Sequence, residues 1–244
     1  GRGIDQILPH SNDPTLHEPY VHSARTYVEL AEEVSGPIPS AVGPDYVWGE
    51  ALDALDAAAP DVRIINLETA VTTSGEFQAD KGIHYRVHPG NADVLEAAAV
   101  DAAVLANNHV LDWGRAGLRE TLDTLKEADV QTVGAGRDAA GAAASVRIEL
   151  SDGRAVRLFA YASPDAGVPR DWSAGPKRPG VNLLPGYGRD ARRHVIEHVR
   201  SHAQEDEVVV VSIHWGSNWG YRIPEEQRTL ARALIDEAGV DIVH

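Results

Sequence analysis

The sequence predicts an α/β protein whose β-sheet is mixed but largely parallel. From about residue 45 onward, short apolar runs alternate with stretches in which apolar residues recur at helical spacing, which is the rhythm of βαβ units. Near the middle of the chain, Asp152-Gly153 separates two apolar runs and predicts a hairpin, so one neighbouring strand is expected to be antiparallel. With 244 residues, 43% of them hydrophobic, the chain can bury a core without disulfides.

The elements follow in order along the chain. Helical spacing of apolar residues predicts helices over 45–59, 91–99, 114–126, 189–203 and 224–238, the first of them stopped by Pro60. Strands are expected over 61–66, 101–106, 130–133, 146–150, 156–161, 207–213 and from 240 onward. Residues 163–188 contain five prolines and five glycines, which predicts a long surface loop.

Composition excludes several classes of function. The 22 Lys+Arg against 37 Asp+Glu give a net charge of −15, which argues against binding to nucleic acid or to anionic lipid. Apolar runs such as Val208–Val211 and Ala102–Ala106 are far shorter than the roughly 18 residues that span a bilayer, so no transmembrane segment is expected. No signal segment is visible either, which favours a cytoplasmic protein, with a cell-surface location as the alternative. Without methionine and with a strand-like run at its end, the sequence is expected to be part of a longer chain. The oligomeric state stays open.

Polar side chains stand at the ends of three predicted strands, where ligands collect in open α/β sheets. The three strand ends contribute Glu68, Asn108 and His214, and we expect their side chains to converge. A two-metal hydrolytic site needs a bridging carboxylate and neutral N or O ligands, and the absence of cysteine leaves only such ligands. Each residue alone also fits a structural role, as a capping Glu, a turn Asn or a buried His. The coincidence of three such strand ends favours the metal site.

Three stretches then resemble a known family. IINLETAV, LANNHVLDWG and SIHWGSNWG are similar to motifs of the CapA family, bacterial poly-γ-glutamate capsule-synthesis proteins with the calcineurin-like metallophosphoesterase fold. The resemblance covers residues 1–244, and its NNHxLDxG block is the most specific part. It implies a single domain over 1–244, with two mixed β-sheets packed face to face between helices (α/β/β/α). It also implies a binuclear site for two divalent ions of Mn, Zn, Fe or Ca.

The resemblance assigns roles by position. It makes Glu68 the bridging or primary carboxylate, and Asn108 and His214 metal ligands. His109 is similar to the proton donor beside the metals, and Asp112, three residues on, is placed to orient it by accepting its second ring N–H.

Two arginines are candidates for substrate binding. Arg2 resembles the arginine that follows the family's first metal-binding aspartate, whose Gly-Asp motif would precede Gly1. The closing Gly-His motif would follow His244, so the sequence carries about half of a two-metal site. Arg86 has the planar fork that clamps a carboxylate or phosphate, although a surface arginine is the commoner role.

Three functions stay open at this stage. The first is a metal-dependent hydrolase of a phosphoester or of a peptide-like γ-glutamyl substrate, with His109 transferring a proton. The second uses the same metals for acid/base isomerisation of a peptide substrate. The third is a non-catalytic accessory protein of polymer assembly or export that binds polyglutamate. The charge of −15 counts against the third, because it repels an anionic chain.

Overall fold

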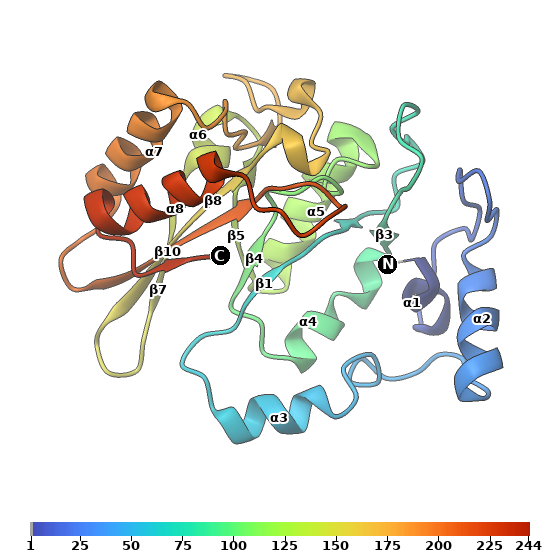
Figure 1. The fold of residues 1–244 in the computed structure, drawn as a ribbon. Helices are drawn as coiled ribbons and strands as arrows, with labels where there is room; N and C mark the ends of the chain where they lie inside the picture. The colour runs from blue at the N-terminus through green and yellow to red at the C-terminus, as the bar shows by residue number, and fades with distance from the viewer. Residues whose placement is uncertain (1) are drawn as a thin grey trace. The chain divides into compact units, whose positions relative to one another are not determined.

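The computed structural model describes residues 2–244, and its internal contacts divide the chain into two compact units. The first unit comprises Gly1–Asp101 and His109–Val130, and the second comprises Ala102–Asn108 and Gln131–His244. Helices and several small sheets occur along the chain (Figure 1), which confirms the mixed α/β class. The single domain over 1–244 stays a prediction.

The first unit is mostly helical. Its helices are α1 (Arg2–Ile7), α2 (Arg25–Ser35), α3 (Ala51–Ala58), the 3-10 turn η1 (Pro89–Asn91), α4 (Asp93–Ala97) and α5 (Gly114–Glu127). Its strands are β1 (Ile64–Asn66), β2 (Ala70–Val71) and β3 (Arg86–Val87), of which β2 and β3 pair in parallel. Helix α5 packs on β2, where the buried hydroxyl of Thr121 accepts the backbone N–H of Val71 at 2.9 Å.

The start of the first predicted helix, at residue 45, is wrong, because α3 begins at Ala51. Residues before Ala51 fold into turns, and Gly49 adopts φ +51°, a left-handed conformation that interrupts a helix. The end agrees with the prediction, because Ala59 is left-handed and Pro60 cannot continue the helix.

The second unit contains two sheets that contact each other. Strand β4 (Ala102–Val104) pairs in parallel with β5 (Gln131–Val133). A four-stranded sheet has the order β11-β10-β8-β7, with β7 (Val146–Glu149), β8 (Ala155–Ala162), β10 (Glu207–His214) and β11 (Ile242–Val243). Strand β10 is parallel to β8 and β11, whereas β7 and β8 form the predicted antiparallel hairpin. Strand β5 contacts β7 and β8. The mixed, largely parallel prediction is confirmed for this unit.

Gly134 allows the two sheets of the second unit to approach closely. It follows β5 with φ +86°, and a Cβ there would lie 2.5 Å from the Ala106 Cβ and 2.8 Å from the Ala160 Cβ. A larger residue would therefore push the strands apart as well as strain the backbone.

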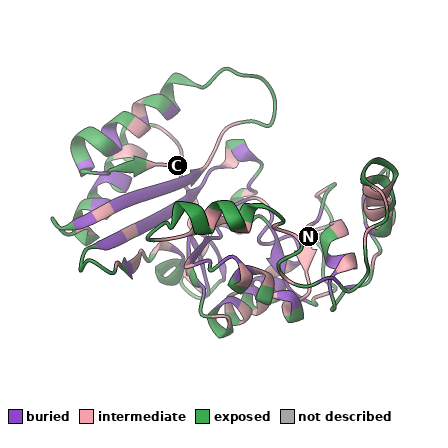
Figure 2. Cartoon of the chain, turned by 90° about the horizontal axis from the view of Figure 1, so that it is seen from below, coloured by how far each residue is buried: buried purple, intermediate pink, exposed green. Residues whose placement is uncertain are grey.

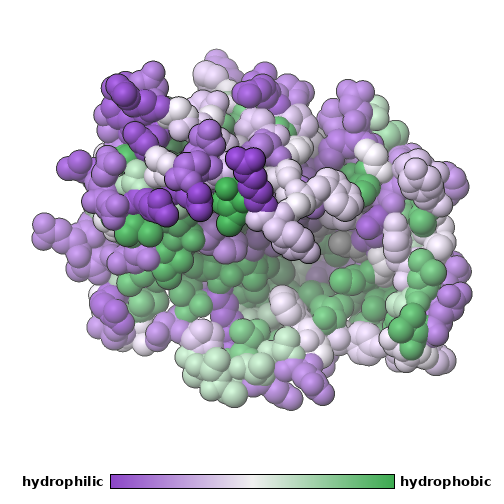
Figure 3. Space-filling model, in the orientation of Figure 1, coloured by the Kyte–Doolittle hydropathy of each residue, from purple (hydrophilic) through white to green (hydrophobic). Residues whose placement is uncertain are grey.

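Two helices cover one face of the four-stranded sheet. Helices α7 (Arg189–His202) and α8 (Glu225–Ala238) lie side by side along β8 and β10 (Figure 1). Both strands are buried along most of their length, whereas the outer faces of the helices are exposed (Figure 2) and mainly hydrophilic (Figure 3). The core between them includes Phe159, Leu184, Val195, Val199, Val211, Ile213, Leu230 and Leu234. Among residues 2–244, no helix has the length and apolar composition that crossing a bilayer requires.

The segment 163–188 is not the surface loop that its prolines predict. It contains the 3-10 turns η2 (Pro164–Ala166) and η3 (Arg170–Trp172), and β9 (Gly180–Val181) pairs antiparallel with β6 (Ala135–Gly136), which precedes α6 (Ala139–Ala143). Trp172 and Leu184 are 2% and 0% exposed. Burial of these apolar side chains offsets the entropy of ordering the segment, which the count of prolines and glycines does not register.

A buried carboxylate at the start of β10 predicts acid sensitivity. Glu207 accepts from Arg157 at 2.7 and 2.9 Å and from Arg147 at 2.9 Å, and these hydrogen bonds, that from Arg157 foremost, lower its pKa despite burial. A carboxyl whose folded pKa lies below its unfolded value of about 4.3 stabilises the fold above that value, and the contribution disappears as pH falls through the folded pKa. We expect Glu207→Gln to lower the melting temperature at pH 7 and much less at pH 3. A difference in melting temperature between wild type and Glu207→Gln that stays constant from pH 3 to pH 7 would contradict this.

Candidate metal and proton-transfer site

The centre of the candidate site is a buried His–Asp pair in the first unit. The chain turns at 109–112, where the Asp112 N–H donates to the His109 carbonyl at 3.1 Å. This turn returns the carboxylate to the ring, and His109 Nδ1 lies 2.6 Å from Asp112 Oδ2, the hydrogen bond that the sequence predicts. The side chains are 9% and 0% exposed. Because a carboxylate only accepts, Nδ1 carries a proton, and the lone pair of a neutral imidazole is on Nε2.

Asp112 is held by two further donors from the segment between β2 and β3. Lys81 Nζ lies 2.5 Å from Oδ1, and the Tyr85 backbone N–H donates to Oδ2 at 2.8 Å. The same segment is attached through Gln78, whose N–H donates to the Asp112 carbonyl at 2.8 Å. With His109, three hydrogen-bond donors therefore fix the orientation of this carboxylate.

Lys81 is the residue that sequence reasoning missed. Burial lowers its pKa, while the charges of Asp112 and Glu68 act in the opposite direction. Nothing in the Asp-Lys-Gly stretch at 80–82 distinguishes it from a turn on the surface. Only the tertiary fold brings its ammonium group to Asp112.

The ring of Tyr85 covers one face of His109. The two rings are stacked with centroids 4.0 Å apart and an interplanar angle of 22°. Arg2, near the N-terminus, also contacts Tyr85. Its Cζ lies 4.9 Å from the centroid of the Tyr85 ring and 4.2 Å from the centroid of the Tyr27 ring. Arg2 also binds both carboxylate oxygens of Glu18, at 2.6 and 2.7 Å. Its role in substrate binding stays a prediction.

Glu68 lies next to the outer nitrogen of the His109 ring. Its Oε1 is 3.9 Å from His109 Nε2, too far for a hydrogen bond, and Asn66 Nδ2 donates to its Oε2 at 3.1 Å. The carboxylate is 40% exposed. A carboxylate oxygen and an imidazole nitrogen are both ligand types for divalent cations, and here they are neighbours at the surface of the unit.

Arg86 has structural contacts that its sequence context does not predict. Its guanidinium lies 3.7 Å from the centroid of the Trp113 ring and donates to the carbonyls of Ser74 and Asp13 at 2.9 and 3.2 Å. It therefore ties three segments of the first unit together. Its role as a substrate clamp stays a prediction.

The second unit carries the other two predicted metal ligands. His214 ends β10, where its backbone carbonyl accepts the Ser163 N–H at 2.9 Å, and it is half-buried. Asn108 follows β4, and its Nδ2 lies 3.4 Å from the point where a Cβ on Gly167 would stand. Gly167 has φ +79°, so both backbone conformation and space favour glycine beside this amide.

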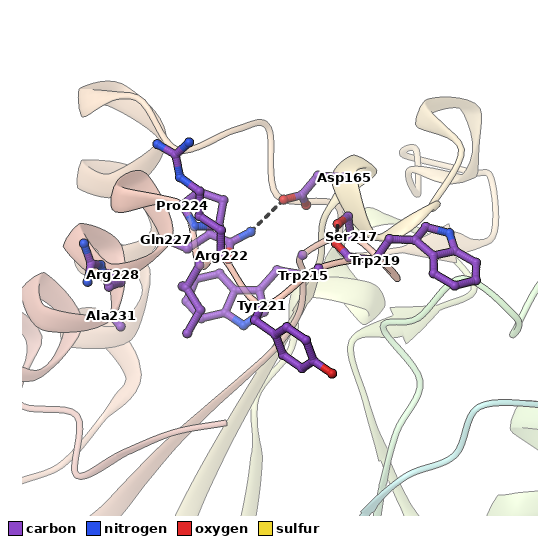
Figure 4. Close-up of a pocket in the computed structure, with 13 residues that line it drawn as sticks. Asp165, Trp215, Ser217, Trp219, Tyr221, Arg222, Pro224, Gln227, Arg228 and Ala231 are labelled. Carbon is purple, nitrogen blue, oxygen red and sulfur yellow. Dashed lines mark hydrogen bonds between the residues drawn. The ribbon is translucent and has the colours of Figure 1, made fainter.

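A polar network around Asp165 lies at the edge of a cavity of about 640 Å³, whose lining includes Trp215, the residue after His214. Asp165 accepts from Gln227 of α8 at 2.7 Å (Figure 4). It also accepts from Tyr187 at 2.8 Å. Burial opposes ionisation of Asp165, but hydrogen bonds from Ser163, Tyr187 and Gln227 outweigh it and lower its pKa. Burial and this carboxylate raise the pKa of Tyr187 to about 12, so the phenol donates. The cavity is lined by Trp215, Trp219, Tyr221 and Arg222 among others.

The predicted site residues divide between the units. Glu68, His109, Asp112, Arg2 and Arg86 belong to the first unit, and Asn108 and His214 to the second. The convergence of Glu68, Asn108 and His214 therefore stays a prediction. Within residues 2–244 there is no cluster of three or more His, Asp or Glu side chains arranged to hold a metal ion. The donor types present fit divalent cations, with further ligands needed to complete each shell.

The whole chain matches a known family. Residues 1–244 match the model of the bacterial capsule synthesis protein PGA_cap. The chain is 44% identical over its full length to the "probable polyglutamine synthesis accessory protein" of Mycobacterium tuberculosis, and it spans 64% of that protein. It is 30% identical over 73% of its length to the PGA biosynthesis protein CapA of Bacillus subtilis, covering 44% of that protein. Over 68% of the chain it is 28% identical to the capsule biosynthesis protein CapA of Bacillus anthracis, covering 39% of that protein. The resemblance in its sequence motifs is thus confirmed, and the chain belongs to the bacterial capsule synthesis protein family, PGA_cap.

Proposed function

We propose that this chain is part of a metal-dependent enzyme of capsule polymer synthesis, which performs acid/base chemistry on a peptide-like γ-glutamyl chain or a phosphoester. The observation that carries the proposal is the buried His109–Asp112 pair, fixed by Lys81 and lying beside Glu68. A structural histidine needs one hydrogen-bond partner. It does not need a carboxylate that is itself held by an ammonium group and a backbone N–H.

The chain's own residues support proton transfer at His109 Nε2. Asp112 accepts from Nδ1, so it fixes the tautomer and stabilises the imidazolium when Nε2 takes a proton. Lys81 and the Tyr85 N–H hold Asp112 in that position. The Tyr85 ring prevents rotation of the imidazole and excludes water from one of its faces. His109 can then accept a proton from water or donate one to a leaving group.

The metal part of the proposal rests on Glu68, Asn108 and His214. A carboxylate, an amide oxygen and an imidazole suit Mn, Zn, Fe or Ca, with the first three ions favoured by the imidazole. A bound dication would supply Lewis-acid polarisation of a carbonyl or phosphoryl oxygen and a more acidic water.

The name of the M. tuberculosis relative favours a second candidate, a non-catalytic accessory protein. In this reading the same fold binds an anionic polymer during assembly or export. Arg222 and Arg228 at the 640 Å³ cavity would supply the positive charge that such a chain needs.

An assay on the intact protein separates these functions. Metal-loaded protein is incubated with a γ-glutamyl oligomer and, separately, with a phosphomonoester, and the products are analysed for chain length, stereochemistry and free phosphate. Shortened oligomers or free phosphate would support hydrolysis, and changed stereochemistry at constant length would support isomerisation. Binding of the oligomer without any product would support the accessory function and contradict the enzyme.

The contacts of Lys81 lead to a mutational prediction. We expect Lys81→Met to lower kcat by about 10–100-fold with little change in KM, because an outer partner that orients a catalytic group usually contributes that much. Lys81→Arg should keep more of the activity, since it retains the charge next to Asp112. The matched control is Lys177→Met at an exposed position of the second unit. Steady-state kinetics of the three variants decide, and a Lys81→Met enzyme with unchanged kcat would remove Lys81 from the site.

A further inference from the structure

We propose that the first unit binds a single internal water molecule, which bridges Asn12, His84 and Trp113. A cavity of about 20 Å³ lies among these three side chains. One water molecule needs about 10–15 Å³ of cavity volume measured in the same way. The cavity therefore holds one water molecule and no larger ligand. The three residues come from distant parts of the sequence, and all of them line this cavity.

Each of these three lining residues has a buried polar side-chain atom that lacks a protein hydrogen-bond partner within residues 2–244. Asn12 Nδ2, His84 Nδ1 and Trp113 Nε1 have no hydrogen-bond partner among residues 2–244. The residues are 8%, 2% and 3% exposed. Leaving a buried donor or acceptor unsatisfied is unfavourable, so three such atoms on residues around one cavity favour a ligand that bonds to all of them.

The chemistry of the three atoms selects water. His84 Nε2 lies 2.7 Å from the Gln78 carbonyl, which can only accept, so Nε2 carries the proton and Nδ1 of the neutral ring accepts. Asn12 Nδ2 and Trp113 Nε1 only donate. A molecule at this site must therefore accept twice and donate once. Water does both, whereas chloride cannot donate and ammonium cannot accept.

The charges around the cavity also favour a neutral ligand. Arg2 and Arg86 are balanced by Asp5 and Asp13. The buried Asp5 is satisfied by other groups, accepting from Asn12 N at 2.8 Å and His88 N at 2.7 Å. The charged side chains that line the cavity are therefore two of each sign, which does not favour an ion.

Two residues of the site adjoin, along the chain, residues that form or hold the His109–Asp112 pair. Trp113 follows Asp112, and His84 precedes Tyr85, whose N–H holds the same carboxylate. The rings of His84 and Trp113 are 6.2 Å apart and edge to face. A water between them would join the two segments that position Asp112 to the N-terminal segment at Asn12.

A crystal structure of the intact protein at about 1.5 Å resolution tests the proposal directly. We expect a density peak about 2.7–3.2 Å from all three atoms. No peak, or a peak that gives an anomalous signal after a bromide soak, would overturn it, the second because the ligand is then an anion. ¹⁵N NMR of His84 should show the Nε2–H tautomer, and a proton on Nδ1 would contradict the proposed bonding.

A double-mutant cycle gives an independent measurement. Asn12→Ala and Trp113→Phe each remove one donor, and each should lower the melting temperature by about 2–4 °C. If one water links them, the double variant should lose clearly less than the sum, because the first change already loosens the water. Trp219→Phe at an exposed position is the matched control, and its effect should add to that of Asn12→Ala. Additive losses for Asn12 and Trp113 would overturn the bridge.

Discussion

Replacing His109 by Asn should lower turnover by about 10²–10⁴-fold, the usual contribution of a positioned acid or base. The amide of Asn can still donate to Asp112, which keeps the buried carboxylate paired, but it has no basic nitrogen to exchange a proton. We therefore expect the melting temperature and the metal content to change little.

The measurement is kcat of purified intact protein together with metal analysis of the same samples. His22→Asn is the matched control, because His22 is exposed and its side chain lies outside the site. It should leave both readouts unchanged. A His109→Asn protein with wild-type turnover would exclude His109 from the reaction.

Replacing Glu68 by Ala should release at least one metal ion per chain and abolish turnover. Two dications close together repel each other, and without cysteine only carboxylates can offset that repulsion by their charge. Glu68 is the carboxylate whose Oε1 lies 3.9 Å from His109 Nε2. Its loss should therefore affect metal binding before it affects folding.

Metal analysis of the variant tests this prediction, with exposed Glu29→Ala on α2 as the control for loss of one negative charge. The control should retain all of its metal. Full metal content in Glu68→Ala would show that Glu68 is no ligand, and the accessory function would then be favoured over the enzyme.

Much of the second unit could be predicted because its signals are local. The runs that form β8 and β10 are apolar and continuous, the Asp152-Gly153 turn specifies the hairpin, and α7 and α8 have clear helical spacing. The segment 163–188 could not be predicted, since its order comes from buried contacts such as those of Trp172. The short helices α1 and α2 were also not predicted, because short amphipathic segments give little signal without their packing partners.

Within the site, the His109–Asp112 contact could be predicted because it is local. Their spacing of three residues requires only one turn of chain. The contribution of Lys81 could not be predicted, because it depends on how the segment between β2 and β3 folds over Asp112. The stacking of Arg86 on Trp113 likewise depends on tertiary packing of residues 27 positions apart.

The most direct test of the proposed metal-dependent chemistry is turnover of the γ-glutamyl or phosphoester substrate by the intact protein before and after removal of its metals. The account predicts that a chelator abolishes product formation and that one of Mn²⁺, Zn²⁺ or Fe²⁺ restores it in the wild type but not in His109→Asn. Product formed at the same rate by metal-free protein would contradict the metal's role. Metal-loaded protein that binds the polymer and forms no product would contradict the enzyme itself.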